Sequence, residues 1–193
     1  MLEDKLKDKK ILLASKSPRR QELLRSLGLD FEIVSIDSDE SFPADLKREK
    51  ITEHIAVNKA KAFRMLNPDE ILIAADTIVW FAGQKIGKPK NEQDAIEMLS
   101  KLSGQTHEVF TSVCICSAEK QICFSESTEV DFDLIKPEEI SYYIEHFKPF
   151  DKAGSYGIQD WFGYTQIVGI RGDYYNVMGL PVRKVYQALL NDF

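Results

Sequence analysis

The sequence predicts a mixed α/β fold in which helices cover the faces of a sheet and two lobes flank a cleft. Two observations support this fold class. Strand-like apolar runs alternate with helical patterns early in the chain, whereas β-hairpin patterns dominate the middle, from Glu108 onwards. No linker or repeat interrupts the 193 residues, so we expect a single domain over residues 1–193.

The first strand and helix are predicted from a short apolar run and the residues that follow it. Residues 11–14 are apolar and largely branched, which is typical of a buried strand. Ser17 is a suitable N-cap, Pro18 suits the first helical position, and Gly28 supplies a stop. The chain is therefore expected to turn from strand to helix at Ser17.

Periodicity and turn residues predict the next elements. Residues 31–36 alternate as a strand does, and residues 47–66 carry a helical pattern that Asn67-Pro68 ends. Residues 71–75 form the most apolar short run of the chain, as expected for a central strand, and the strand pattern resumes at 77–81.

The remaining elements follow from the same signals. They are a hairpin return through 85–89, a helix between Asn91 and Gly104, strands at 109–116 and 122–134, a helix that Pro137 opens, an irregular functional loop at 148–163, a second hairpin from 164–170 and 173–177, and a helix that begins at Pro181. The last three helices are expected to bury Ala95, Ile96, Met98, Leu99 and Leu102; Ile140, Tyr143, Ile144 and Phe147; and Val182, Val185, Leu189 and Leu190.

Composition excludes several classes of protein. Apolar residues make up 44% of the chain and charged residues 29%, and the net charge is −6. This acidic balance argues against general binding to nucleic acid polymers. No apolar run approaches the roughly 20 residues of a membrane span, and the charged segment 1–10 precedes too short an apolar run for a secretory signal. We expect a cytoplasmic protein with no membrane partner.

Cysteine and histidine spacing indicates no zinc site and no disulfide framework. The three cysteines are odd in number and lack the CxxC spacing. Cys114 and Cys116 lie two apart in an apolar run, so we expect buried free thiols on one face of a strand. The three histidines lack ligand spacing, and none is assigned a role.

A basic turn at the start of the first predicted helix indicates a phosphate site. Arg19 and Arg20 occupy a first turn that usually holds acidic residues, and Lys16 lies just before them. A phosphate would accept hydrogen bonds both from the free backbone N–H groups and from the guanidinium groups. The alternative interpretation is a solvated basic turn.

Asp76 follows the most apolar run directly. If buried, its carboxylate needs a cation, which is either a lysine or a metal ion. The predicted hairpin would bring Lys88 close to Asp76. The alternative is a bulge whose Asp reaches solvent at the end of the sheet. The acidic loop at 37–43 is, by itself, best interpreted as a solvated turn.

Several stretches, in order along nearly the whole chain, resemble the Maf family of septum-formation-inhibitor-like nucleoside triphosphate pyrophosphatases. They are Leu13-Ala14-Ser15-Lys16-Ser17-Pro18-Arg19-Arg20, Asn58-Lys59-Ala60-Lys61-Ala62, Ala75-Asp76-Thr77-Ile78-Val79, Gly87-Lys88-Pro89, Leu102-Ser103-Gly104-Gln105-Thr106-His107, Asp151-Lys152-Ala153-Gly154-Ser155-Tyr156-Gly157-Ile158-Gln159 and Val177-Met178-Gly179-Leu180-Pro181. The set is specific, although any one stretch alone would be weak. It implies the elongated, twisted sheet of Maf and ITPase-like proteins.

The resemblance implies hydrolysis of a nucleoside triphosphate between its α and β phosphates, with a divalent metal ion (Mg or Mn) and a homodimer. It implies catalytic roles for Asp76, Lys59 and Lys88, metal binding by Glu40 and Asp76, and substrate binding by Ser15, Arg19, Arg20, Thr77 and Gln159. Of these, Arg19, Thr77 and Gln159 match the branch that prefers dTTP and UTP, and modified pyrimidine triphosphates are further expected substrates.

Some assignments stay open at this point. Asp76 can act as general base or as metal ligand, and either Asp39 or Glu40 can take the acidic-loop role. Gln159 is followed by Asp160-Trp161-Phe162, where relatives usually have a glycine, which leaves the loop shape open. The alternative functions are a nucleotide-binding regulator of septum formation that acts through a protein partner, and a pyrophosphatase of the methylated-GTP branch. A pure binder has no use for Asp76 with Glu40, which favours the enzyme.

Overall fold

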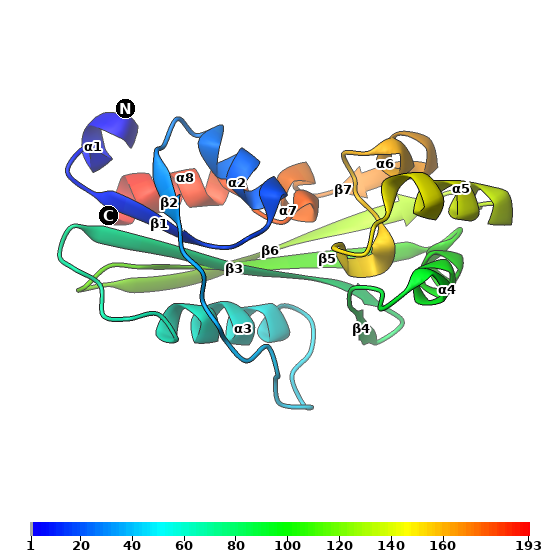
Figure 1. Cartoon of the computed structure of the whole chain (residues 1–193), viewed down its shortest axis with the longest axis horizontal. Coiled ribbons are helices and arrows are strands. Elements are labelled where there is room, and N and C mark those ends of the chain that lie inside the picture. Colours follow the sequence, from blue (N-terminus) through cyan, green and yellow to red (C-terminus); the bar gives the residue numbers. More distant parts are fainter. Residues whose placement is uncertain (1) are drawn as a thin grey trace. The chain divides into compact units, whose positions relative to one another are not determined.

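The computed structural model describes residues 2–193 and shows a mixed sheet with helices (Figure 1). The strands are β1 Lys10–Ala14, β2 Phe31–Ile33, β3 Glu70–Phe81, β4 Gln84–Ile86, β5 Thr106–Cys116, β6 Gln121–Phe132 and β7 Ile167–Arg171. The helices are α1 Leu2–Leu6, α2 Pro18–Arg25, α3 Glu49–Lys61, α4 Glu92–Leu102, α5 Pro137–Phe147, the 3₁₀ turn η1 Ala153–Ser155, α6 Trp161–Gln166, α7 Tyr174–Met178 and α8 Val182–Asp192.

The sheet has the strand order β2-β1-β3-β5-β6-β7, with β4 paired to β3. β1 is parallel to both β2 and β3, whereas the β3–β4 and β6–β7 pairs are antiparallel. The predicted mixed α/β fold class is therefore confirmed. No helix among residues 2–193 is long and apolar enough to cross a membrane.

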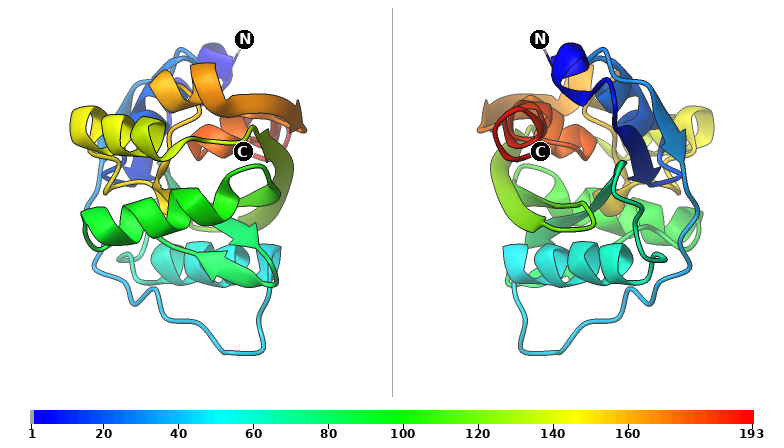
Figure 2. Two further views of the ribbon diagram at one scale, coloured as in Figure 1. Left: turned by 90° about the vertical axis from the view of Figure 1, so that its right-hand side faces the viewer. Right: turned by 90° about the vertical axis from the view of Figure 1, so that its left-hand side faces the viewer.

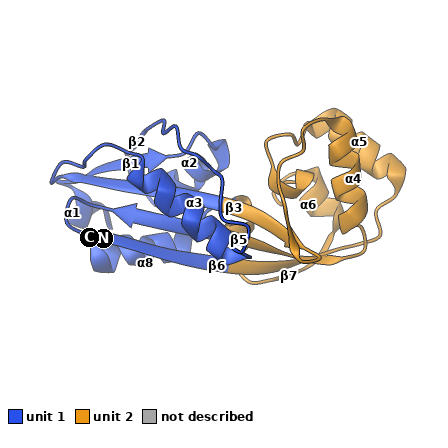
Figure 3. Ribbon diagram, turned by 90° about the horizontal axis from the view of Figure 1, so that it is seen from below, with its two compact units in different colours: residues 1–76, 111–126, 179–193 blue, residues 77–110, 127–178 orange. Residues whose placement is uncertain are grey.

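The chain divides into two compact units, and β3, β5 and β6 contribute residues to both (Figure 3). Unit 1 comprises residues 1–76, 111–126 and 179–193, and unit 2 comprises residues 77–110 and 127–178. The single domain expected over residues 1–193 and the expected cleft stay predictions.

In unit 1, α3 lies on one face of the sheet, and α2 and α8 lie on the other (Figures 1 and 2). A cluster of mostly small buried residues lies between α3 and the sheet: Leu12, Ala14, Ala56, Ala60, Leu72, Ala74, Cys114 and Cys116. Small side chains on both surfaces allow the helix backbone to come close to the strands. This close packing sets where the polar residues at the edge of α3 can reach.

The central strand β3 continues through Asp76 without a break. Its first half pairs with β1, from Lys10↔Glu70 to Ala14↔Ala74, and its last residues pair with β4. Asp76 is only 8% exposed. The alternative that Asp76 reaches solvent at the end of the sheet is therefore wrong, and its carboxylate must be compensated inside the protein.

In unit 2, α4 packs against α5 and against η1. Asn91 caps α4 as predicted, since its side chain accepts a hydrogen bond from Asp94 N at 2.9 Å. An aromatic core lies nearby, in which the rings of Phe132, Tyr156 and Phe162 contact one another.

Residues 164–177 do not form the predicted hairpin. They contribute to α6, β7 and α7, and β7 pairs with β6 instead. Phe162 is fully buried and anchors α6, while the Asn176 amide of α7 donates to Val109 O and Thr128 Oγ1, both at 2.9 Å. These tertiary contacts override the strand propensity of the tyrosines and valines in this stretch.

Smaller differences from the prediction have similar causes. The sequence did not indicate α1, whose buried Leu2 and Leu6 lie one turn apart, and α1 packs against α8. α3 ends at Lys61, earlier than expected from Asn67-Pro68. Phe147 is exposed and stacks on Tyr143 rather than facing inward.

Candidate active site

The turn from β1 to α2 is built as predicted, except for its cap. Pro18 is the first helical residue and Ser17 is the N-cap, but the Ser17 side chain makes no capping hydrogen bond. The Ser17 N–H donates instead to Ser15 Oγ at 3.2 Å. Ser15 is buried, so its hydroxyl helps to fix the turn from within.

Arg20 lies in the first turn of α2 and binds backbone carbonyls from two other segments of unit 1. Its Nε donates to Gly179 O at 2.8 Å, and one terminal nitrogen donates to Ala75 O at 3.0 Å. The same nitrogen lies 3.5 Å from Ser15 Oγ. The guanidinium group therefore holds α2 against the segment before α8 and against the residue that precedes Asp76.

Burial lowers the pKa of the Arg20 guanidinium, and the nearby Asp76 carboxylate acts in the opposite direction. An arginine stays protonated in proteins, so Arg20 is a fixed positive charge here. The structure thus brings together Ser15, Arg20 and the Asp76 region, as the sequence predicts. Arg19 lies half-buried in the same turn, and its contact with substrate stays a prediction.

Lys59, near the C-terminal end of α3, lies between two carboxylates. Its Nζ is 2.9 Å from Asp76 Oδ1 and 2.8 Å from Glu40 Oε1. The Lys59 and Asp76 side chains are 13% and 11% exposed, whereas Glu40 is 60% exposed. Of the two cations considered from the sequence for Asp76, the lysine is present, and it is Lys59. We call these three side chains the Glu40–Lys59–Asp76 cluster.

The two acidic-loop carboxylates have different surroundings. Glu40 contacts Lys59, whereas Asp39 accepts hydrogen bonds from Ser41 N at 2.8 Å and from Ser41 Oγ at 2.6 Å. These bonds lower the pKa of Asp39. Asp39 thus shapes its own turn, and Glu40 is the loop acid that reaches the cluster.

The Glu40–Lys59–Asp76 cluster has two negative charges and one positive charge. No group of three or more His, Cys, Asp or Glu side chains among residues 2–193 could hold a metal ion by itself. Magnesium, however, is usually bound by one or two carboxylates together with substrate phosphates and water. The donor set of Glu40 and Asp76 therefore fits a divalent ion that binds with a polyphosphate.

Three further predicted site residues belong to unit 2. Thr77 follows Asp76 in β3, and strand alternation points its side chain to the opposite face. The β3–β4 hairpin forms as predicted, but its pairing ends at Ile86, before the exposed Lys88. The roles of Thr77 and Lys88 stay predictions.

Gln159, the third of these residues, has an unusual environment within unit 2. Its side-chain Oε1 is buried and has no hydrogen-bond partner in the protein. Its backbone carbonyl accepts a hydrogen bond from the Tyr164 hydroxyl at 2.6 Å. A buried carbonyl oxygen without a partner is uncommon, because leaving it unpaired costs about 1–3 kcal/mol. The loop therefore leaves the acceptor of the Gln159 amide unused.

The sequence does not predict the shape of the loop beyond Gln159. In the structure, hydrogen bonds to Asp160 and Gly157 define it. The Tyr143 hydroxyl donates to the Asp160 carboxylate at 3.0 Å and accepts a hydrogen bond from Gly157 N at 3.1 Å. A Cβ on Gly157 would lie 2.4 Å from Asp160 Oδ2, so a larger residue there would displace the Asp160 carboxylate. Asp160 therefore helps to fix the loop through Tyr143.

Sequence reasoning missed the backbone groups that hold Arg20. Gly179 and Ala75 take part through their carbonyl oxygens, which any residue type supplies. Gly179 lies inside one of the stretches that carry the family resemblance and has a positive φ of 111°. That glycine is the one signal that could have indicated a constrained segment before α8.

Known proteins are similar to this chain over nearly its whole length. A family model described as Maf-like protein matches residues 10–192. A Phocaeicola vulgatus protein named dTTP/UTP pyrophosphatase is 52% identical over 191 residues, covering 98% of both chains. Proteins of the same name from Bacteroides fragilis and Flavobacterium johnsoniae are 50% identical over 182 residues (93% of this chain, 94% of the relative) and 49% identical over 190 residues (98% of both). The chain therefore belongs to the Maf family.

Proposed function

We propose that the protein hydrolyses dTTP and UTP, and modified pyrimidine triphosphates, to the monophosphate and pyrophosphate. The observation that carries this proposal is the Glu40–Lys59–Asp76 cluster beside Arg20, which combines acid groups with fixed positive charge. Relatives of about 50% identity that bear the name dTTP/UTP pyrophosphatase support the substrate class. The homodimer and the cytoplasmic location stay predictions.

In this proposal water attacks the α phosphorus, the bond from that phosphorus to the bridging oxygen breaks, and pyrophosphate leaves. Negative charge spreads over the phosphate oxygens in the transition state. Arg20 and Lys59 stabilise that charge from a largely buried site, where a fixed positive charge acts more strongly than in water. Lys88 is proposed to add a third positive charge.

Asp76 has two candidate roles in this reaction. It can accept the proton of the attacking water, or it can hold a divalent ion together with Glu40. Such an ion, when bound, lowers the pKa of its water and neutralises phosphate charge. In either role, Lys59 holds the Asp76 carboxylate in place through its 2.9 Å contact.

The products test the proposed reaction. We expect purified protein with UTP and Mg²⁺ to release UMP and pyrophosphate in equal amounts, as measured by anion-exchange chromatography. Formation of UDP and orthophosphate would show cleavage at the wrong bond. Binding of UTP without any turnover would instead support a regulator that acts through a protein partner.

We also expect activity to depend on a divalent ion. Excess EDTA should reduce pyrophosphate release to background, and Mg²⁺ or Mn²⁺ added beyond the chelator should restore it, because hard cations suit carboxylate and phosphate oxygens. Excess EDTA already saturated with Mg²⁺ is the matched control. Full turnover in metal-free EDTA would mean that the arginine and lysine side chains neutralise the phosphates unaided.

A further inference from the structure

The three cysteines of the chain lie in the β5–β6 hairpin of unit 1, outside the candidate active site. All three are free thiols. Cys114 and Cys116 are buried on one face of β5, as predicted, whereas Cys123 on β6 is exposed. The hairpin therefore offers one accessible thiol and two protected ones.

Two cross-strand contacts define the register of the hairpin. Ser117 N donates to Lys120 O at 2.8 Å, and Ser112 Oγ lies 2.8 Å from Ser125 Oγ. Both pairs fit the same antiparallel register, and that register places Cys114 directly opposite Cys123. Directly opposite residues have Cα atoms about 4.5–5.5 Å apart, within the range of about 4.4–6.8 Å that disulfides span.

Cys116 is less well placed to bond with Cys114. Its Sγ is 3.6 Å from Cys114 Sγ, but the two residues are neighbours along the same strand. Residues i and i+2 of a strand have Cα atoms about 6.6 Å apart, near the upper end of the disulfide range. Geometry therefore prefers the cross-strand pair over the pair within β5.

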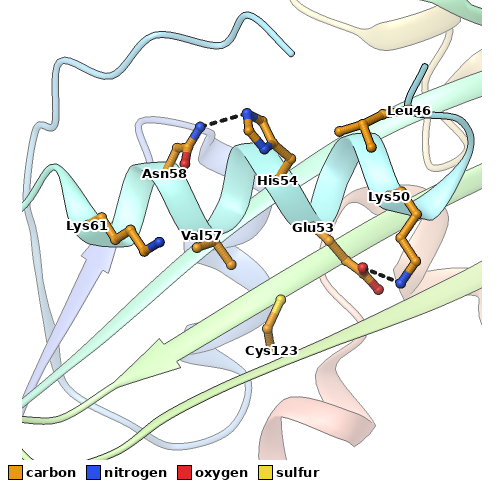
Figure 4. Close-up of a pocket in the computed structure, with 8 residues that line it drawn as sticks. All are labelled: Leu46, Lys50, Glu53, His54, Val57, Asn58, Lys61 and Cys123. Atoms are coloured by element: carbon orange, nitrogen blue, oxygen red, sulfur yellow. Dashed lines mark hydrogen bonds and ion pairs between the residues drawn. The ribbon is translucent and has the colours of Figure 1, made fainter. Parts of the chain in front are cut away.

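Cys123 also lines an open pocket beside α3, together with Lys50, Glu53 and Val57 (Figure 4). A hydrogen bond with the Cys114 thiol lowers the pKa of Cys123 and the Lys50 ammonium acts in the same direction, whereas burial and the Glu53 carboxylate act in the opposite direction. Hydrogen bonds with the other two thiols, together with burial, raise the pKa of Cys114. An accessible thiol with a second thiol directly opposite is the arrangement of a redox-sensitive cysteine and its resolving partner.

We propose that Cys123 and Cys114 form a reversible disulfide when the protein meets hydrogen peroxide. The Cys123 thiolate attacks one peroxide oxygen, which gives a sulfenic acid and, with one proton, water. Cys114 Sγ then attacks Cys123 Sγ, the S–S bond forms, and the hydroxyl leaves as water with the Cys114 proton. The two thiols lose two electrons, and peroxide is reduced to two waters. A dithiol reductant reverses the bond by exchange.

Thiol counting tests this step on the full chain. After brief treatment of reduced protein with hydrogen peroxide, titration in denaturant should show a fall from three thiols to one, and dithiothreitol should restore three. Trypsin cleaves after Lys120 and so separates Cys123 from the other two cysteines. Mass spectrometry should then find the two peptides linked, with the loss of two hydrogen atoms.

Variants identify the partner of Cys123. Cys116→Ser is the matched control, because Cys116 is buried beside Cys114. This variant should still form the Cys114–Cys123 disulfide, and its thiol count should fall from two to none. Cys123→Ser and Cys114→Ala should each keep both remaining thiols under the same treatment. Cys123 is exposed, so Cys123→Ser decides the point even if Cys114→Ala does not fold.

Three outcomes would overturn the proposal. They are a link that disappears in Cys116→Ser, a dimer joined through Cys123 on a non-reducing gel, and a Cys123 sulfenic acid that accumulates without any link. A link that forms in the wild type and in Cys116→Ser but in neither of the other two variants supports it.

Discussion

Asn in place of Asp76 is expected to lower kcat for UTP hydrolysis by about 10²–10⁴-fold while the fold is retained. Asn keeps the size of the side chain but can neither accept a proton from water nor bind a divalent ion strongly. Lys59 keeps its 2.8 Å contact with Glu40, so no buried charge is left uncompensated. Pyrophosphate release and a thermal unfolding curve measure the two effects, and we expect an unfolding midpoint no lower than that of the wild type.

Glu70→Gln is the matched control, because Glu70 is the other buried carboxylate of β3. Its oxygens accept two hydrogen bonds from Arg64, at 2.6 and 2.7 Å, and this pairing lowers the pKa of Glu70 from 4.5 to about 2. The folded-state pKa is depressed, so the contribution to stability is present above about pH 4.5 and is lost as the pH falls towards 2.

We therefore expect opposite results from the two substitutions in β3. Glu70→Gln should keep near-normal turnover at neutral pH but unfold at lower urea concentration, and the urea midpoint should fall less steeply with pH below 4.5 than in the wild type. If Glu70→Gln loses as much turnover as Asp76→Asn, the loss reflects damage to β3. If Asp76→Asn keeps near-normal turnover, Asp76 is structural and the mechanism is wrong.

Selectivity for a uracil-type base is expected to depend on Gln159. A uracil or thymine ring presents an N–H between two carbonyl oxygens, so one Gln amide can accept from the N–H while donating to a carbonyl. The Gln159 Oε1 atom is buried without a protein partner, which suits that acceptor role. We expect the ratio of kcat/KM for UTP to that for GTP to be well above one and to fall about 10- to 100-fold in Gln159→Ala, because the substrate loses a buried hydrogen bond.

Tyr164→Phe distinguishes base recognition from a merely structural role of Gln159. The Tyr164 hydroxyl donates to the Gln159 backbone carbonyl, so this variant removes a bond that holds the loop but leaves the amide in place. In Tyr164→Phe, we expect the ratio of kcat/KM for UTP to that for GTP to stay close to the wild-type ratio. A wild-type ratio near one, or an equal fall in both variants, would contradict the assignment.

Local chemistry made much of the fold predictable. The β1–α2 boundary follows from an apolar run, an N-cap residue and Pro18, all within a few residues of one another. The α4 cap at Asn91 and the start of α8 after Pro181 were correct for the same reason. The hairpin expected at 164–177 was wrong because burial of Phe162 and Asn176, and not local propensity, decides that region.

For the site, the sequence by itself determined which groups need partners. It indicated that a carboxylate after the most apolar run, if buried, requires a cation, and that the acidic loop held two candidate acids. Only the tertiary structure decided that Lys59 is that cation and that Glu40, rather than Asp39, joins it. The physical reason is that Lys59 and Asp76 lie 17 positions apart, and close packing of small residues such as Ala56 and Ala74 brings α3 near enough for a 2.9 Å contact.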